Sequence, residues 1–393
     1  MKYPIMIKTF QRLNHTNSTL SYLTKTTINP NDFQLKKPTH FIPKSLLVLS
    51  TPNNLPQVIE DSIKFHQDPS LSDLQLVVAG VDTVVPYSHR NGVSELWMNQ
   101  PIKIGQSLLL EDRDDLNKPP RESDGLNIVV AKKNWKNIES NLNIKLRNDM
   151  NLNLNLANTV FSTGSIITLF YFSHINNQKG GINHLGQHLC DLQIELPRGV
   201  VPRHSHASIH DNWTDLYPGE NSFKITKCVG NLLKTVDNKP AAKLLEDNDK
   251  LMSIGSKETE VYVKIKKPNS NTVERFKVIA GGGGWGAKAD IIALSPEAKL
   301  ENGSEIQFYM VTPEDRYLNR HDDGNVDKYV NSFTFTNSYE QTGYEDHQSE
   351  EQKVYENVFG CGSEHGFFFN GIKHNSPGES ITLKLGGSKE KKI

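Results

Sequence analysis

Two short stretches of the sequence gather side chains that could perform chemistry. His204, His206 and His210 lie close enough in the chain to share a metal ion, with Asp211 as a fourth ligand. The second stretch, from Cys361 to His365, holds a thiol, a carboxylate and an imidazole. The histidines have no paired cysteine, and a nucleophilic cysteine needs a base within hydrogen-bond reach, which closeness in sequence does not provide. We therefore interpret both stretches as structural and predict no catalytic residue, no metal site and no cofactor.

A glycine-rich stretch at residues 281–288 is similar in composition to a phosphate-binding loop. Consecutive glycines allow backbone N–H groups to approach an anion closely. Lys288, however, stands one place late for the phosphate-loop pattern and is followed by a strand-like segment, so that no helix N-terminus would face a phosphate. We interpret the stretch as a connection between strands with positive φ angles, and contact with a ligand is the alternative. The residues that would make this contact are Gly283, Gly284 and Trp285.

Charged and titratable side chains follow the second strand of a predicted β-α-β unit. Residues 45–50 and 74–81 are apolar and flank residues 54–66, where apolar side chains recur at helical spacing. Such a unit pairs its strands in parallel, and open α/β sheets bind ligands beyond the carboxyl ends of their strands. A charged loop rim is the alternative interpretation. The candidate ligand-binding residues are Asp82, His89, Arg90 and Glu95.

The chain after this unit has mainly the patterns of β-strands. Residues 150–156 alternate apolar side chains with asparagine, which is the period of a strand. Residues 159–162 and 166–173 are apolar runs, and we predict that they form an antiparallel pair turned at Thr163-Gly164. Residues 201–222 are rich in Pro, Ser and His with little periodicity, which indicates a connection between two lobes.

The second predicted lobe combines strands with one long polar segment. Residues 261–266 and 273–280 flank a turn-forming sequence and predict a β-hairpin. Between residues 314 and 356 acidic side chains dominate and periodicity is weak, which favours a surface insertion.

Length and composition limit the classes of function. A chain of 393 residues is long enough for two structural units. Its formal net charge of -1 provides no overall field to attract nucleic acid, so we predict no nucleic-acid partner. The longest strongly apolar run, residues 165–172, is about half of the roughly 20 residues that a transmembrane helix needs. Cys190, Cys228 and Cys361 are scattered, which indicates reduced thiols in an intracellular, soluble protein.

The first residues have the composition of a targeting segment. From Met1 to Asn31 the sequence contains no Asp or Glu, while basic, hydroxyl and amide residues are frequent. This composition is typical of a mitochondrial transit peptide, so we expect the matrix as location, with the cytoplasm as the alternative. We expect residues 1–44 to be targeting segment and linker, and removal of residues 1–31 to leave the folded body intact. Residues 387–393 are predicted to be a charged tail.

Several segments resemble the FIST-domain family, and in particular its stand-alone fungal branch. They are AGVD (79–82) with NGVSELW (91–97), LANTVF (156–161), KCVGNLL (227–233) with VDNKPA (236–241), and GGGGWGAK (281–288). The resemblance covers roughly residues 45–385 at the level of motifs. It implies a two-part sensory module that binds small molecules such as amino acids and has no established active site.

Together these observations predict an α/β (mixed α+β) fold with two lobes, mixed and antiparallel sheets and few helices. We expect the lobes at residues 45–215 and 216–386, the second one carrying the acidic insertion. The expected function is non-enzymatic binding of a small-molecule ligand by a mitochondrial FIST-domain protein. The alternatives are an assembly or scaffold factor that acts on a protein partner and, behind it, an enzyme of unrecognised type.

Overall fold

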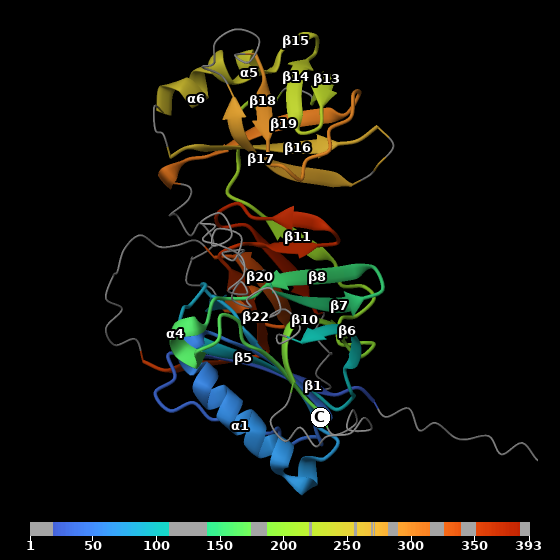
Figure 1. Ribbon diagram of the computed structural model, residues 1–393, viewed down its shortest axis with the longest axis vertical. Coiled ribbons are helices and arrows are strands. Elements are labelled where there is room, and N and C mark those ends of the chain that lie inside the picture. Colours follow the sequence, from blue (N-terminus) through green and yellow to red (C-terminus); the bar gives the residue numbers. More distant parts are fainter. Residues whose placement is uncertain are drawn as a thin grey trace, which may run out of the picture.

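A computed structural model describes residues 19–109, 140–173, 187–219, 222–254, 258–268, 270, 272–281, 290–314, 326–338 and 351–385. The fold is mixed α+β, with mixed and antiparallel sheets and few helices, as predicted (Figure 1). Among the described residues no helix is both long and apolar enough to cross a membrane. Short 3-10 turns occur at Pro52–Asn54, Pro69–Leu71 and Val326–Lys328.

The predicted β-α-β unit is confirmed. Strand β2 (Ser45–Ser50) pairs in parallel with β3 (Gln75–Gly80), and α1 (Leu55–Gln67) connects them. Helix α1 starts with a proline in its first turn, where a missing N–H costs nothing, and it ends at Gln67 because Asp68 is extended before a proline.

These strands lie in the middle of a 12-stranded sheet. Its other strands are β1 (Tyr22–Ile28), β5 (Gly92–Met98), β6 (Lys103–Leu109), β7 (Asn141–Arg147), β8 (Met150–Asn155), β9 (Leu169–Phe172), β10 (Gln187–Glu195), β21 (Lys353–Glu356), β23 (Phe367–Phe369) and β24 (Ile372–His374). Their order across the sheet is β21-β1-β5-β2-β3-β9-β10-β7-β8-β23-β24, and β6 also pairs with β10.

Both faces of the central strands are buried, because alternate side chains enter two different cores. Leu46 and Val48 of β2 pack in the cluster that includes helix α1, whereas Leu47 and Leu49 pack in the cluster of a second, five-stranded sheet. The strands of that second sheet are, in spatial order, β11 (Ala207–His210), β25 (Ser380–Lys384), β20 (Ser332–Asn337), β22 (Val358–Ser363) and β4 (Thr83–Val84).

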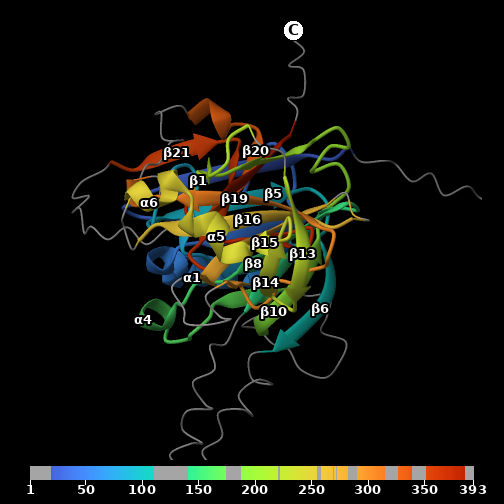
Figure 2. The same cartoon turned by 90° about the horizontal axis from the view of Figure 1, so that it is seen from above.

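A separate unit is inserted between β11 and β20, and it lies at the top of Figure 1 and over the rest of the molecule in Figure 2. Its eight-stranded sheet has a hydrophobic cluster of its own. The strands are β12 (Thr214–Asp215), β13 (Phe223–Val229), β14 (Leu232–Val236), β15 (Lys239–Pro240), β16 (Glu260–Lys266), β17 (Val273–Gly281), β18 (Ile292–Leu294) and β19 (Glu305–Val311), and its helices are α5 (Ala241–Glu246) and α6 (Asp249–Ile254). The predicted hairpin corresponds to the antiparallel pair of β16 and β17.

The arrangement of the two units differs from the predicted lobes. The inserted unit begins near the expected boundary at residue 215, but residues 332–385 return to the first unit and share its hydrophobic cluster. We call the described residues of 19–210 and 326–385 the body, and residues 214–311 the inserted unit. The expected surface insertion at 314–356 contains β20, a buried central strand whose Phe333 and Phe335 fill the core of the body.

The N-terminal expectation is also wrong for one segment. Strand β1 lies between β5 and β21 within the large sheet, so residues 22–28 belong to the body and not to a linker. Residues 1–18 lie outside the described part of the chain, and the predicted targeting function of this segment stays a prediction.

The predicted strand at residues 159–162 is a short helix, α4 (Val160–Thr163). Gly164 ends it with φ of 76°, a left-handed conformation that glycine adopts without strain. The hydroxyl of Thr159 lies 2.8 Å from that of Thr168, which fixes the turn to the start of β9. The apolar residues of this run do not form a core, since Phe161 is fully exposed.

Candidate functional site

The residues predicted from the end of β3 do not form one pocket. The Asp82 carboxylate accepts a hydrogen bond of 2.8 Å from the backbone N–H of Glu364, and Arg90 pairs with the Glu364 carboxylate at 2.6 Å. Burial, the largest influence, raises the pKa of Asp82. Asp82 and Arg90 are therefore brought together through Glu364, and they connect the loops before and after β4 to the loop after β22.

The other predicted residues have different surroundings. Glu95 lies on β5, fully buried, with the Lys25 ammonium at 2.9 Å and a hydrogen bond of 2.8 Å from the Trp97 indole N–H. Burial raises the pKa of Glu95 more than Lys25 lowers it. His89 forms a backbone bridge with Val84. The candidate contacts Gly283, Gly284 and Trp285 lie outside the described residues.

The histidine and cysteine stretches do not assemble into reactive groups in the part of the chain that is described. No cluster of three or more His, Cys, Asp and Glu side chains there could hold a metal ion. Asp211 binds Arg275 and Lys264 of the inserted unit. Cys361 is buried, and burial raises the pKa of its thiol, so that the nucleophilic thiolate is disfavoured.

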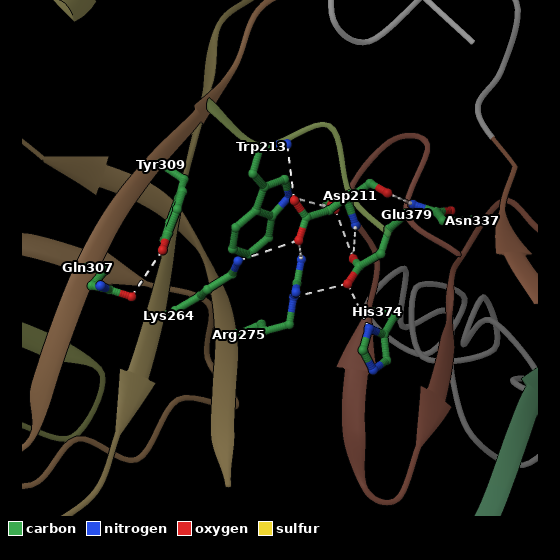
Figure 3. A network of polar contacts seen from close by, with 10 residues as sticks. Asp211, Trp213, Lys264, Arg275, Gln307, Tyr309, Asn337, His374 and Glu379 are labelled. Atoms are coloured by element: carbon green, nitrogen blue, oxygen red, sulfur yellow. Dashed lines mark hydrogen bonds and ion pairs between the residues drawn. The ribbon is translucent and has the colours of Figure 1, made fainter. Parts of the chain in front are cut away.

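A largely buried polar cluster around Arg275 joins the two units, and we call it the junction (Figure 3). Arg275 of β17 lies between two carboxylates, with its NH2 2.7 Å from Asp211 and its Nε 3.0 Å from Glu379. The guanidinium also stacks on Trp213, 3.9 Å from the ring centre. Burial alone would raise the pKa of Asp211, but Arg275 and then Lys264 outweigh it and hold that pKa below its usual value.

Glu379 completes the junction on the side of the body. Its Oε1 lies 2.6 Å from His374 Nδ1, and its Oε2 accepts hydrogen bonds from the backbone N–H and the hydroxyl of Ser376. The Ser376 hydroxyl in turn accepts a hydrogen bond of 2.8 Å from the Trp213 indole N–H. The buried His374 Nε2 has no hydrogen-bond partner among the described residues, but the charged groups of the cluster pair with one another. The chemistry of the cluster is therefore that of a structural connection between units.

An open site lies elsewhere in the body, at the carboxyl ends of β7 and β10. A cavity of about 390 Å³ is bordered there by the strand ends and by the segment that follows β10. Part of its wall is apolar and comes from Leu146, Leu196 and Val201, which belong to the core. The volume lies within the roughly 300–1,000 Å³ of typical small-molecule sites. We call it the arginine cavity, because Arg147, Arg198 and Arg203 line it.

The carboxylates around the arginine cavity are paired with positive side chains of the protein. Arg147 binds both carboxylate oxygens of Asp149, at 2.6 and 2.8 Å. Glu195 lies 3.5 Å from both Lys103 and Lys145. Burial alone would raise the pKa of Glu195, but these two lysines outweigh it and hold the pKa below its ordinary value. Both carboxylates are thus neutralised by side chains of the protein.

Arg198 and Arg203 also line the cavity, and their positive charges are not paired with a carboxylate among the described residues. Both residues are exposed, and within the described ranges their side chains have no hydrogen bond or ion pair. Arg147 fixes the segment that carries them, since its NH1 donates to the carbonyl oxygens of Pro202 and Arg203 at 2.7 and 2.8 Å. The cavity therefore combines an apolar wall with two available guanidinium groups on an anchored segment, an arrangement suited to an anion.

Sequence reasoning did not identify this cavity. Arg198 and Arg203 each follow a proline, and only Arg203 lies within residues 201–222, which we interpreted as a connection between lobes. The available signal was a pair of arginines in a proline-containing segment, with no Asp or Glu between Arg198 and Asp211. Loops that follow strands on a rigid sheet often carry binding residues.

Comparisons of the chain with protein-family models, with curated proteins and with solved structures find no match. The chemistry of its own residues is therefore what indicates its function.

Proposed function

We propose that this protein binds a small anionic molecule reversibly in the arginine cavity and acts as a non-enzymatic sensor. The observation that carries the proposal is the pair Arg198 and Arg203, whose guanidinium groups lack a protein partner among the described residues and border a cavity with an apolar wall. Guanidinium groups bind carboxylates and phosphates with two parallel hydrogen bonds, and an anion here would balance charges that the protein leaves unbalanced.

The sensory part of the proposal rests on how the cavity is connected to the junction. The segment that carries Arg198 and Arg203 continues into β11, and β11 is followed directly by Asp211. Asp211 is the partner of Arg275 in the inserted unit. A ligand that pulls on the two arginines would act on a chain segment that ends at this ion pair, so binding could change how strongly the two units are connected.

We propose further that the chain is a member of the FIST-domain family in the mitochondrial matrix. The support for the family is the set of motifs quoted from the sequence, and the support for the location is the acid-free, basic composition of residues 1–31.

Native mass spectrometry of the protein purified from its own cells tests the proposed function. We expect a retained mass of small-molecule size in the wild type, and its loss in the double variant Arg198→Gln/Arg203→Gln. Lys266→Gln is the matched control, because it removes an exposed positive charge from the inserted unit. A retained mass that survives in the double variant would refute the arginine cavity as the site.

The alternative function, assembly with a protein partner, is favoured by one observation. Phe161 of α4 is fully exposed and Ile166 nearby is 46% exposed. Exposed apolar side chains that lie together can mark a protein contact. The same spectra would then show a retained protein that is lost in Phe161→Ser and kept in the arginine double variant.

A further inference from the structure

A second depression lies on the same sheet as the arginine cavity. It is a groove of about 580 Å³ over strands β6, β7 and β10, and we call it the amide groove. Asn141, Asn143, Gln106 and Gln193 contribute side-chain amides to its lining, and Asp191 is the only charged residue of that lining. Its lining is therefore rich in neutral hydrogen-bonding groups and carries one carboxylate, in contrast to the cavity.

The register of the sheet places the groove and the cavity in line. Strands β7 and β10 run parallel, with Asn143 beside Gln193 and Lys145 beside Glu195. Gln193 lines the groove and Glu195, two residues further along the strand, lines the cavity. Residues two apart on a strand point to the same face.

Strand β7 has the same alternation. Its side chains at 141, 143, 145 and 147 are partly exposed, and those between them are buried. Asn143 in the groove and Arg147 at the cavity are four residues apart, which at about 3.3 Å per residue corresponds to about 13 Å. One ligand with a length of two sugar rings could therefore reach from the amides to the arginines.

The lining of the groove identifies the class of ligand. A primary amide donates and accepts hydrogen bonds, and so does each hydroxyl group of a sugar. A peptide would pair with the backbone at the edge of β6, whose only partner among the described strands is β10. The amides of β7 and β10 lie instead on the sheet face, where the backbone N–H and C=O groups already bond to neighbouring strands. A row of amides on a sheet face thus fits a polyhydroxylated molecule better than a peptide.

We propose that the ligand is a carbohydrate with one phosphate or carboxylate group. The sugar rings lie in the amide groove, and the anionic group binds Arg198 and Arg203 in the arginine cavity. The inference deepens the proposed function and rests on it, because the anionic end uses the same two arginines.

Calorimetric titration of the full chain tests this proposal with four probes: inorganic phosphate, maltose, maltose 1-phosphate and maltobionate. We expect maltose 1-phosphate or maltobionate to bind at least about tenfold more tightly than inorganic phosphate, and maltose alone to bind weakly. The ratio between the two anionic sugars distinguishes phosphate from carboxylate as the preferred group. In Asn143→Ala/Gln193→Ala, we expect the anionic sugar to lose about tenfold in affinity, as for two lost neutral hydrogen bonds.

The affinity for inorganic phosphate should not change in that variant, and Gln67→Ala, at an exposed position in α1, is the matched control. If phosphate binds but neither anionic sugar binds more tightly, the carbohydrate assignment is wrong while the proposed function stands. An anionic sugar whose affinity is the same in the wild type and in the amide variant would also contradict it. Failure of all four probes would contradict the anion site, and the inference with it.

Discussion

Replacing Arg275 by methionine should weaken the connection between the two units and with it the stability of the whole chain. Methionine is of similar length but cannot pair with a carboxylate. The side chain of Arg275 is 8% exposed, and its two carboxylate partners, Asp211 and Glu379, are 17% and 1% exposed. The substitution would therefore leave two carboxylates in a largely buried place without their main counter-charge.

The expected loss follows from these contacts. Removing one partner of a buried ion pair costs about 3–5 kcal/mol. Glu379 keeps hydrogen bonds from Ser376 and its contact with His374, and Asp211 keeps Lys264 at 3.5 Å. We therefore expect the lower end of this range, about 3 kcal/mol of unfolding free energy at pH 7. The matched control Lys267→Met removes a more exposed pair with Glu274 and should cost at most about 1 kcal/mol.

The effect of pH gives a second, independent readout. The pKa of Asp211 is lowered in the folded state, where burial is outweighed by Arg275, and in the unfolded state it is about 3.9. A lowered pKa contributes stability that is present above the unfolded pKa and lost as pH falls through the folded pKa. This contribution depends on Arg275. The difference in unfolding free energy between the wild type and Arg275→Met should therefore be largest near pH 7 and become smaller below about pH 4.

Urea unfolding followed by circular dichroism between pH 3 and pH 8 measures both quantities. A loss below about 1 kcal/mol at pH 7, equal to that of the control, would refute the junction as a stabilising connection. If the difference in unfolding free energy between the wild type and Arg275→Met does not change with pH, Asp211 does not contribute to stability through its pairing with Arg275.

The remaining predictions concern the body. Lys25→Met should cost about 3–5 kcal/mol because it leaves Glu95 buried and unpaired, and the double variant Lys25→Met/Glu95→Gln should recover part of that loss in the same unfolding assay. Gly360→Ala should prevent folding or cost several kcal/mol, because a Cβ would lie 1.8 Å from the Thr334 carbonyl oxygen. Gly371 also has positive φ but open space around it, so Gly371→Ala should cost about 1–2 kcal/mol, and equal thermal midpoints of the two variants would contradict this. A thiol reagent should modify the half-buried Cys228 before Cys190 and Cys361 in the native protein, and mass spectrometry of peptides that finds Cys361 modified first would contradict its burial. Deleting residues 1–31 should lower the thermal midpoint, contrary to the expectation from composition, because it removes β1 and the partner of Glu95; an unchanged midpoint would show that β1 is dispensable.

The parts of the fold that could be predicted are those with strong local patterns. The unit β2-α1-β3 combines continuous apolar strands with a helix of clear periodicity, and the alternation in β8 is regular. Strand β1 was missed because its Thr and Lys residues resemble the targeting segment before it. Strand β20 was missed because its alternating Phe and Thr stand within a largely acidic stretch, and only pairing with β22 and β25 makes it central.

The sites depend on long-range contacts that the sequence does not show. Glu95 was predicted as a ligand contact because it follows a strand, but it pairs with Lys25, seventy residues earlier in the chain. The arginine cavity is formed where the ends of β7 and β10 meet, and these strands are adjacent only because of the parallel pairing in the sheet. The sequence shows Arg198 and Arg203 as loop residues, and the fold turns them into the border of a cavity.

The most direct test of the central claim is the affinity of the purified chain for inorganic phosphate at low ionic strength, measured by calorimetry. We expect one binding site in the wild type, weaker binding as added salt screens the exposed arginines, and a loss of affinity of at least about tenfold in Arg198→Gln/Arg203→Gln. Lys266→Gln should bind phosphate like the wild type. Equal affinity in the wild type and the arginine double variant, or no binding in either, would show that the arginine cavity is not an anion site.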